Sequence, residues 1–170
     1  MTTTPRLRPL HIALPLLLGA ALAPAIVAPS APAREAPEAV TVRLINDTRT
    51  AHGLPPLRSD PLLARAASAH SRDMVARGYF SHRSTGGAGL GARVARTGWM
   101  RSRRRWRLGE DLAWGTGRLA SPKATVAAWM HSDHHRHILL ERAFRVVGIG
   151  IARGTPGAGA GATFTADFGG

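Results

Sequence analysis

The sequence predicts an α+β domain, in which helices come first along the chain and strands come last. Apolar residues recur at helical spacing within residues 39–53 and again within 61–77. Near the C-terminus, residues 144–154 and 163–169 are alternating and rich in β-branched or aromatic side chains. Helices followed by a strand hairpin favour an α+β fold over repeated βα units.

Residues 1–33 differ in composition from the rest of the chain. Two arginines and no acid precede an apolar stretch, and small residues with an A-x-A signal ending at Ala33 follow it. This order is typical of a secretory signal peptide, so we expect cleavage after Ala33 and a secreted, extracellular protein. A retained anchor helix is the alternative, but the stretch is short and contains two prolines. Residues 34–39 then form a linker to one domain, 40–170.

Charge and cysteine content exclude several classes of function. The 170-residue chain has a net charge of +13, which falls to +11 without residues 1–33, and it has no cysteine. Disulfides, thiolate nucleophiles and Cys-ligated metals are therefore excluded. The positive charge predicts an anionic neighbour such as lipid head groups or wall polymer, although arginine-rich coding explains it equally well. No nucleic-acid recognition motif is present, so we expect no specific nucleic-acid partner.

Capping residues divide the N-terminal part and the middle of the chain into helices. Asp60 before Pro61, and Ser121 before Pro122, are typical of helix starts. Gly53 and Gly78 are typical of helix ends. Between these helices, residues 54–60 are expected to form a turn, 79–91 a glycine-rich loop and 92–98 a short helix. The segment 99–117 is mixed, and its end alternates enough to be a strand or extended segment.

The segment WMHSDHHRHILLE, residues 129–141, contains four of the eight histidines. On one continuous helix, His131 and His135 would share a face and could bind zinc with a third ligand. Ser132 and Asp133 are weak helix formers, however, so the helix can end there and the shared face would be lost. There is no H-E-x-x-H, G-x-S-x-G or Walker motif to suggest another centre.

Five segments in a fixed order resemble one known family. They are INDTRTAHGLPPLRSDPLLARAASAHSRDMVARGYFSH, GEDLAW, VAAWMHSDHHRHILL, VVGIGIA and FTADFG. Together they resemble the bacterial branch of the CAP superfamily, the SCP-like extracellular or cysteine-rich secretory protein family, over Val40 to Gly169. The resemblance implies a three-layer α-β-α sandwich with a small central antiparallel sheet and a cleft at one side.

The resemblance also implies which residues form the cleft. By position in the motifs, His82, Glu110 and His135 match the cleft residues of relatives, and Ser132 stands where animal relatives have a second glutamate. Three positions depart from the usual pattern: Asp111, Ile138 and Ala166 replace asparagine, asparagine and glutamine. The expected cleft and ligand-binding residues are His82, Glu110, His135, Ser132, His70 and Asp111.

Two imidazoles and a carboxylate can hold zinc with an open fourth position, so His82, His135 and Glu110 are also candidate metal ligands. The alternative is a polar brace between loops. We expect a non-enzymatic protein that binds a small amphiphilic, lipid-like ligand or a cell-wall component in this cleft. A zinc-dependent extracellular hydrolase acting on peptide or wall glycan is the alternative.

An arginine-rich run precedes the GED motif. It could dock on an anionic membrane surface, with Trp99 and Trp106 at the interface, or it could be a solvated loop. Its arginines are Arg101, Arg103, Arg104, Arg105 and Arg107. The other two tryptophans, Trp114 and Trp129, are expected in the core.

Overall fold

The computed structural model describes residues 34–157 and 159–170, which form one compact unit. The expected signal peptide and its cleavage site lie outside the described residues. Within the described ranges, no helix combines the length and the apolar character needed to cross a membrane.

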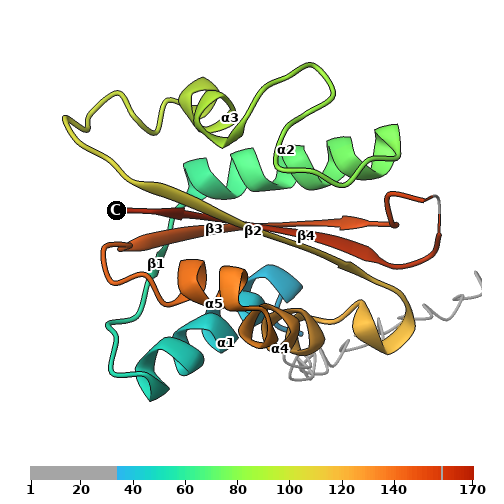
Figure 1. Ribbon diagram of the computed structural model, residues 1–170, viewed down its shortest axis with the longest axis horizontal. Coiled ribbons are helices and arrows are strands. Elements are labelled where there is room, and N and C mark those ends of the chain that lie inside the picture. Colours follow the sequence, from blue (N-terminus) through green and yellow to red (C-terminus); the bar gives the residue numbers. More distant parts are fainter. Residues whose placement is uncertain (1–33, 158) are drawn as a thin grey trace, which may run out of the picture. The chain divides into compact units, whose positions relative to one another are not determined.

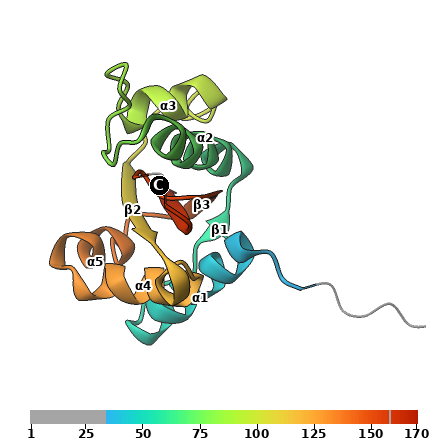
Figure 2. The ribbon, with the colours of Figure 1, turned by 90° about the vertical axis from the view of Figure 1, so that its right-hand side faces the viewer.

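The described residues form three layers, with a sheet between two layers of helices (Figures 1 and 2). Helices α2 and α3 cover one face of the sheet, and α1, α4 and α5 cover the other. The expected three-layer α-β-α sandwich is therefore confirmed. The elements are α1 (Pro37–Ala51), β1 (Arg58–Ser59), α2 (Pro61–Arg77), α3 (Leu90–Thr97), β2 (Leu108–Gly115), the 3-10 helix η1 (Gly117–Leu119), α4 (Pro122–His131), α5 (Asp133–Leu139), β3 (Val146–Arg153) and β4 (Ala162–Gly169).

The sheet has the strand order β1-β3-β4-β2. Strands β3 and β4 form the expected antiparallel hairpin, and β2 pairs antiparallel with β4. The two-residue strand β1 pairs parallel with β3, so the sheet is mixed rather than purely antiparallel. The sequence predicted only a turn at this position, because a two-residue strand is too short to show an alternating pattern.

Helix α2 lies directly on strand β3 because two alternate residues of that strand are glycines. A Cβ atom on Gly148 would stand 2.0 Å from the backbone nitrogen of Ala64, and one on Gly150 would stand 2.1 Å from that of Ser68. Since alternate residues of a strand point to the same face, both glycines open the face that α2 covers. The VVGIGIA segment thus sets the distance between this helix and the sheet.

Caps fix the ends of α2 as the sequence predicted. The Oδ1 atom of Asp60 accepts hydrogen bonds from the backbone nitrogens of Leu62 and Leu63, and Gly78 ends the helix in the left-handed conformation. Helix α1 begins earlier than expected, at Pro37, so the last three residues of the expected linker belong to it. Proline at the first helical position explains this start, because its fixed φ suits a helix and its missing N–H is not needed there.

The histidine-rich segment is two helices rather than one. Ser132 has φ −102° and ψ 123°, which is an extended conformation, and it separates α4 from α5. His131 is therefore the last residue of α4, and His135 belongs to α5. The possibility of a zinc pair on one helical face is thereby excluded, for the reason that the Ser-Asp sequence suggested.

The largest apolar core lies between the sheet and the layer of α1, α4 and α5. Trp129 is buried there, as predicted, and its indole nitrogen donates to the backbone oxygen of Leu112 at 3.1 Å. The prediction for Trp114 was wrong, because this side chain is 51% exposed. Trp114 lies on the end strand β2, whereas α2 packs on β3 and β4 and leaves this part of β2 uncovered.

Substituting Gly150 tests the close packing of α2 on the sheet. The Gly150→Ala variant should lose about 3 kcal/mol of unfolding free energy, because the new methyl group collides with backbone that cannot move aside alone. Urea denaturation measures this change.

Gly91 provides the matched control, since a Cβ there meets nothing within 4 Å. It lies in α3, so Gly91→Ala should gain about 0.5–1 kcal/mol through helix propensity. Equal stability of wild type and Gly150→Ala would contradict the proposed packing constraint.

Candidate functional site

Glu110 is the centre of the candidate site, and three segments of the chain meet at its carboxylate. Strand β2 provides Glu110, the loop between α2 and α3 provides His82, and α3 provides Arg93. The Nδ1 atom of His82 lies 2.8 Å from Oε1 of Glu110, and the Arg93 guanidinium pairs with Oε2. Both oxygens of this buried carboxylate therefore have a partner.

The environment of Glu110 keeps it ionised. Burial alone would raise the pKa of its carboxyl, but the hydrogen bond from His82 and the positive charge of Arg93 lower the pKa below its usual value. Since the carboxylate accepts, His82 donates its Nδ1–H and leaves Nε2 free to act at the surface. Arg93 also donates to the backbone oxygens of His82 at 2.8 Å and Ala88 at 3.1 Å, so it ties the loop to the site.

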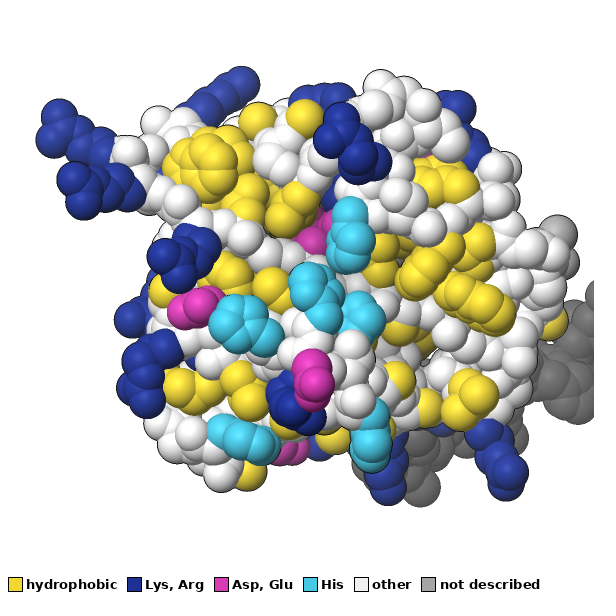
Figure 3. All heavy atoms as spheres, in the orientation of Figure 1, with side chains coloured by type: hydrophobic (Ala, Val, Ile, Leu, Met, Phe, Trp, Pro, Cys, Tyr) yellow, Lys and Arg dark blue, Asp and Glu magenta, His cyan; other side chains and the backbone are white. Residues whose placement is uncertain are grey.

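His135 lies on α5, in the helical layer on the other side of the sheet. Burial, then the charge of His134 and then that of His82 lower the pKa of its imidazole. His135 is therefore a neutral imidazole at pH 7. Figure 3 shows histidine side chains gathered at the middle of one face, beside a recessed acidic side chain. We call His82, Glu110 and His135 the imidazole site.

His70 was expected in the cleft, but it lies behind Glu110 with 1% of its surface exposed. Its Nε2 atom is 2.9 Å from the backbone oxygen of Ser81 and 4.0 Å from Oε2 of Glu110. Burial and then the Arg93 charge lower the pKa of this imidazole. His70 holds the loop that carries His82 against α2, and its position on the inner face of α2 keeps it away from the surface.

Asp111 was also expected in the cleft, and this expectation is wrong. Alternation along β2 turns it to the opposite face from Glu110, where α4 and α5 pack, and it has no solvent exposure. Neither of its oxygens has a hydrogen-bond partner within the described part of the chain. Burial, followed by the Glu110 charge, raises the pKa of Asp111 to about 8. A protonated, fully buried acid cannot contact a ligand in the cleft.

Asp167 completes a group of three buried carboxyls. It stands directly opposite Glu110 in the pairing of β2 with β4 and is fully buried. Burial raises its pKa well above the usual value, and the Glu110 carboxylate raises it further. Only Glu110 has a guanidinium within ion-pair distance among these three, so only Glu110 carries its charge at neutral pH.

The zinc site expected from His82, Glu110 and His135 does not fit this geometry. Arg93 and His82 already occupy both oxygens of Glu110. Within residues 34–157 and 159–170, no three His, Asp or Glu side chains lie close enough together to hold a metal ion. Ser132, the residue at the place of the second glutamate, is partly buried between α4 and α5 and adds no carboxylate.

Trp99, just before the arginine-rich run, and Trp106, within it, have different environments. Trp99 is buried, so the expectation that it sits at an interface is wrong; its indole nitrogen donates to Oδ2 of Asp60 at 2.9 Å. Arg103 covers the Trp99 ring at 4.0 Å from its centroid and lies 3.8 Å from the same carboxylate. Trp106 is half exposed, as an interface would require.

Sequence reasoning missed Arg93, although the sequence contained a signal for it. Leu90, Arg93, Val94 and Thr97 follow the i, i+3, i+4, i+7 spacing that marks the inner face of a helix. A buried arginine on such a face requires hydrogen-bond acceptors, and the Glu110 carboxylate is one of them. The sequence places Asp167 in the FTADFG segment, but only the strand pairing shows that it faces Glu110.

The raised pKa of Asp111 predicts a measurable pH dependence of stability. Because the folded protein holds this proton and the unfolded chain releases it, stability due to Asp111 is present below pH 4 and is lost as pH rises towards about 8. Relative to Asp111→Asn, wild type should lose roughly 3 kcal/mol or more of unfolding free energy over this interval.

Urea denaturation of both proteins at several pH values measures this difference, and the exposed Asp133→Asn variant is the control for removal of a surface charge. Parallel pH profiles for wild type and Asp111→Asn would show that Asp111 is ionised in the folded protein.

Comparison with known proteins agrees with the fold and with the order of the motifs. The sequence model of the cysteine-rich secretory protein family, CAP, matches residues 42–168. The Bacillus subtilis protein YkwD is 33% identical over 122 residues, which are 66% of this chain and 41% of that protein. The Bacillus subtilis membrane protein YlbC is 33% identical over 110 residues, 65% of this chain and 30% of that protein. This chain thus spans less than half the length of these relatives.

Solved structures give the same result. An extracellular protein containing an SCP domain from Bacillus anthracis aligns with a TM-score of 0.65 and 28% identity, covering 78% of this chain and 39% of that chain. An outer surface protein from Borrelia burgdorferi shares the fold, with a TM-score of 0.62 and 19% identity over 76% of this chain and 89% of that chain. The match to the family model over most of the described residues leads to one conclusion: this chain belongs to the cysteine-rich secretory protein, or CAP, family, and is of the bacterial SCP type.

Proposed function

We propose that this CAP-domain protein is exported and binds a small amphiphilic ligand or a cell-wall component at the imidazole site, without catalysing a reaction. The proposal rests on the hydrogen bonds of the Glu110 carboxylate. Both of its oxygens are held by His82 and Arg93, so it positions its neighbours and has no free oxygen for a substrate proton. The His82 side chain, in contrast, is half exposed and keeps one ring nitrogen for a ligand.

Apolar side chains near the imidazole site suit an amphiphilic ligand. Phe80 is two residues before His82 in the same loop and is 45% exposed. Trp114 follows Glu110 on the same face of β2 and is about half exposed. Exposed aromatic rings beside a few fixed polar groups are typical of sites that bind the apolar part of a ligand and orient its polar part. Rings of this kind also stack on sugars of a wall glycan.

The acids near the site argue against a hydrolase that uses a carboxylate as its general base. Such a carboxylate must be ionised and must reach a water molecule. Asp111 and Asp167 are buried and hold their protons at neutral pH, and Glu110 is engaged by a guanidinium. A zinc-dependent reaction would first require Arg93 to leave Glu110, which would strand a buried charge.

Export is supported by the composition of residues 1–33 and by the relatives. The basic, apolar and small-residue order is that of a secretory signal. One structural relative is described as extracellular, and another as an outer surface protein. A wall component or an amphiphile is the kind of ligand that such a protein would meet.

Two histidine variants and a matched control test the proposed binding. Purified protein starting at Arg34 is mixed with peptidoglycan sacculi in a sedimentation assay and with oleate in a calorimetric titration. We expect one of these ligands to bind wild type, and His82→Ala and His135→Ala to weaken that binding about tenfold or more. His137→Ala removes an exposed histidine from the same helix as His135 and should bind like wild type.

Equal binding by all four proteins would refute the role of the imidazole site. The same samples also test the hydrolase alternative, by measuring release of soluble wall fragments with and without added Zn²⁺. Fragment release that depends on zinc and is lost in His82→Ala would replace the binding proposal with a catalytic one.

The tip of the arginine-rich run is proposed as a contact for anionic membrane surfaces. Arg101, Arg104 and Arg105 are exposed and have no acidic partner within 4.0 Å among the described residues. All three precede the half-exposed Trp106 in the chain, and Arg105 is next to it. A double variant Arg104→Gln/Arg105→Gln should bind phosphatidylglycerol vesicles several-fold more weakly than wild type at low salt. Wild-type binding should also weaken as salt is added.

Vesicle sedimentation measures this binding. Arg118→Gln, which removes an exposed arginine in η1, is the control and should bind like wild type. Binding that is unaffected by salt and by the double variant would rule out this contact.

A further inference from the structure

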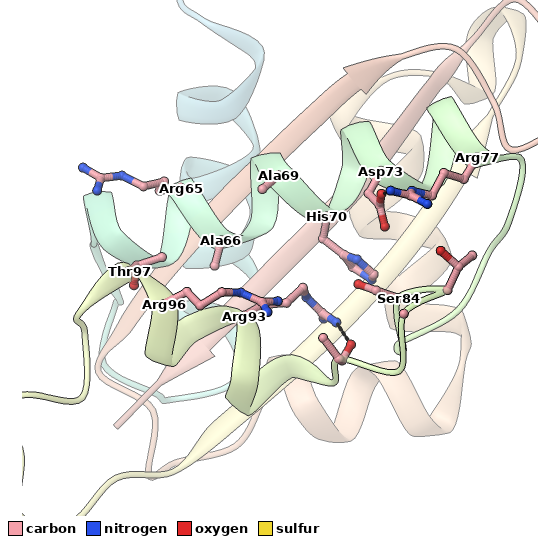
Figure 4. Close-up of a pocket in the computed structure, with 13 residues that line it drawn as sticks. Arg65, Ala66, Ala69, His70, Asp73, Arg77, Ser84, Arg93, Arg96 and Thr97 are labelled. Carbon is pink, nitrogen blue, oxygen red and sulfur yellow. Dashed lines mark hydrogen bonds and ion pairs between the residues drawn. The ribbon is translucent and has the colours of Figure 1, made fainter.

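A pocket of about 540 Å³ lies between α2, α3 and the loop 84–88. Figure 4 shows side chains entering it from both helices, with His70 and Asp73 projecting from α2 and Arg93 and Arg96 from α3. This volume is within the range of small-molecule sites. We propose that this pocket is a second binding site, separate from the imidazole site, for a small ligand that carries a phosphate group.

The charge of the pocket favours an anion. Four arginines line it, namely Arg65, Arg77, Arg93 and Arg96, and Asp73 is the one acid among the lining residues. The Asp73 carboxylate is already taken, because Arg77 donates to it at 2.7 Å and the Tyr79 hydroxyl donates at 2.5 Å. It therefore neutralises one arginine and no more.

Two of the four guanidinium groups remain without a counter-ion. Arg93 pairs with Glu110, and Arg77 pairs with Asp73. Arg65 and Arg96 have no acid within 4.0 Å and no side-chain hydrogen bond in the part of the chain that the structure describes. Two uncompensated positive charges beside one cavity match the charge of a phosphate monoester, which is about −1.5 to −2 at pH 7.

Hydrogen-bond donors around the pocket suit a tetrahedral oxyanion. Guanidinium groups donate two parallel N–H bonds to phosphate oxygens, and the hydroxyls of Ser84 and Thr85 add donors from the loop. Ala66, Ala69 and Ala88 also line the pocket, and their small side chains leave the arginines room to approach a ligand. Free phosphate and a phosphorylated small molecule share this chemistry.

The pocket lies behind the imidazole site rather than within it. His70 and Arg93 line the pocket, and the same two side chains approach Glu110 from the inner side. His82 and His135 are not among the lining residues. A ligand in the pocket would thus perturb His70 while leaving His135 unchanged, and this difference separates the two sites experimentally.

Calorimetric titrations with inorganic phosphate and with glycerol 3-phosphate, at ionic strength held constant with chloride, test the proposal. Wild type should bind at least one of them. Arg65→Gln/Arg96→Gln should bind at least about tenfold more weakly, because two charge-assisted contacts are lost. Arg72→Gln removes an exposed arginine of α2 that lies outside the pocket and should change affinity by less than about twofold.

The two ligands distinguish the sources of phosphate. Tighter binding of glycerol 3-phosphate supports a phosphorylated organic ligand, whereas equal binding supports recognition of the phosphate alone. Affinity that is equal in wild type and Arg65→Gln/Arg96→Gln, or the absence of heat for both ligands, would overturn the proposal. Thermal unfolding in chloride shows whether the double variant folds. If it does not, the single variant Arg96→Gln replaces it in the comparison with wild type and should also bind phosphate more weakly.

Histidine NMR signals locate the bound ligand independently of affinity. In the titration with phosphate, the ring signals of His70 should shift and those of His135 should not. A shift at His135 with none at His70 would place the ligand at the imidazole site and refute the second site. This result would leave the proposed function of the imidazole site standing.

Discussion

The contact between α2 and β3 is the constraint on which the rest of the domain depends. With glycine at positions 148 and 150, the helix backbone reaches the strand backbone without intervening side chains. This leaves the inner face of α2 at a fixed height above the neighbouring strands β4 and β2. At this distance from the sheet, the hydroxyl of Ser71 hydrogen-bonds the hydroxyl of Thr165 at 2.8 Å. The ring of His70 likewise reaches the backbone oxygen of Ser81 in the loop. The loop that carries His82 is consequently placed by backbone packing several residues away.

A single ionised carboxylate organises the polar side of the domain. Glu110 connects β2, α3 and the loop before α3 through one guanidinium and one imidazole. Asp167 and Asp111 lie next to it in space or in sequence, yet burial without a cation keeps both protonated. The domain thus avoids three adjacent buried charges by neutralising two with protons and one with Arg93. Removal of Arg93 would therefore change the position of the surface residue His82, because Arg93 contacts both its backbone and its partner Glu110.

Much of the fold could be predicted from the sequence because its signals are local. The caps at Asp60 and Gly78, the glycine-punctuated hairpin and the helix break at Ser132 each depend on a few adjacent residues. Trp99 was expected at the surface and is buried, whereas Trp114 was expected in the core and is exposed. Burial of a tryptophan depends on which distant element covers it, and the local sequence does not show this. The alternation along β2 places Asp111 away from Glu110, yet the motif match grouped the two together. The role of Arg93 could not be predicted from the sequence, because it depends on the contact with Glu110 from a different element.

The two carboxylate oxygens of Asp60 bind different parts of the domain, and one of these parts is the base of the arginine-rich run. One oxygen caps α2, and the other receives Trp99 and faces Arg103. The base of the run is therefore fixed to a rigid helix end, while Arg104, Arg105 and Trp106 extend beyond it into solvent. A partner that meets this tip encounters a short, pre-positioned arm, and less chain entropy is lost on binding than with a loop that is free at both ends.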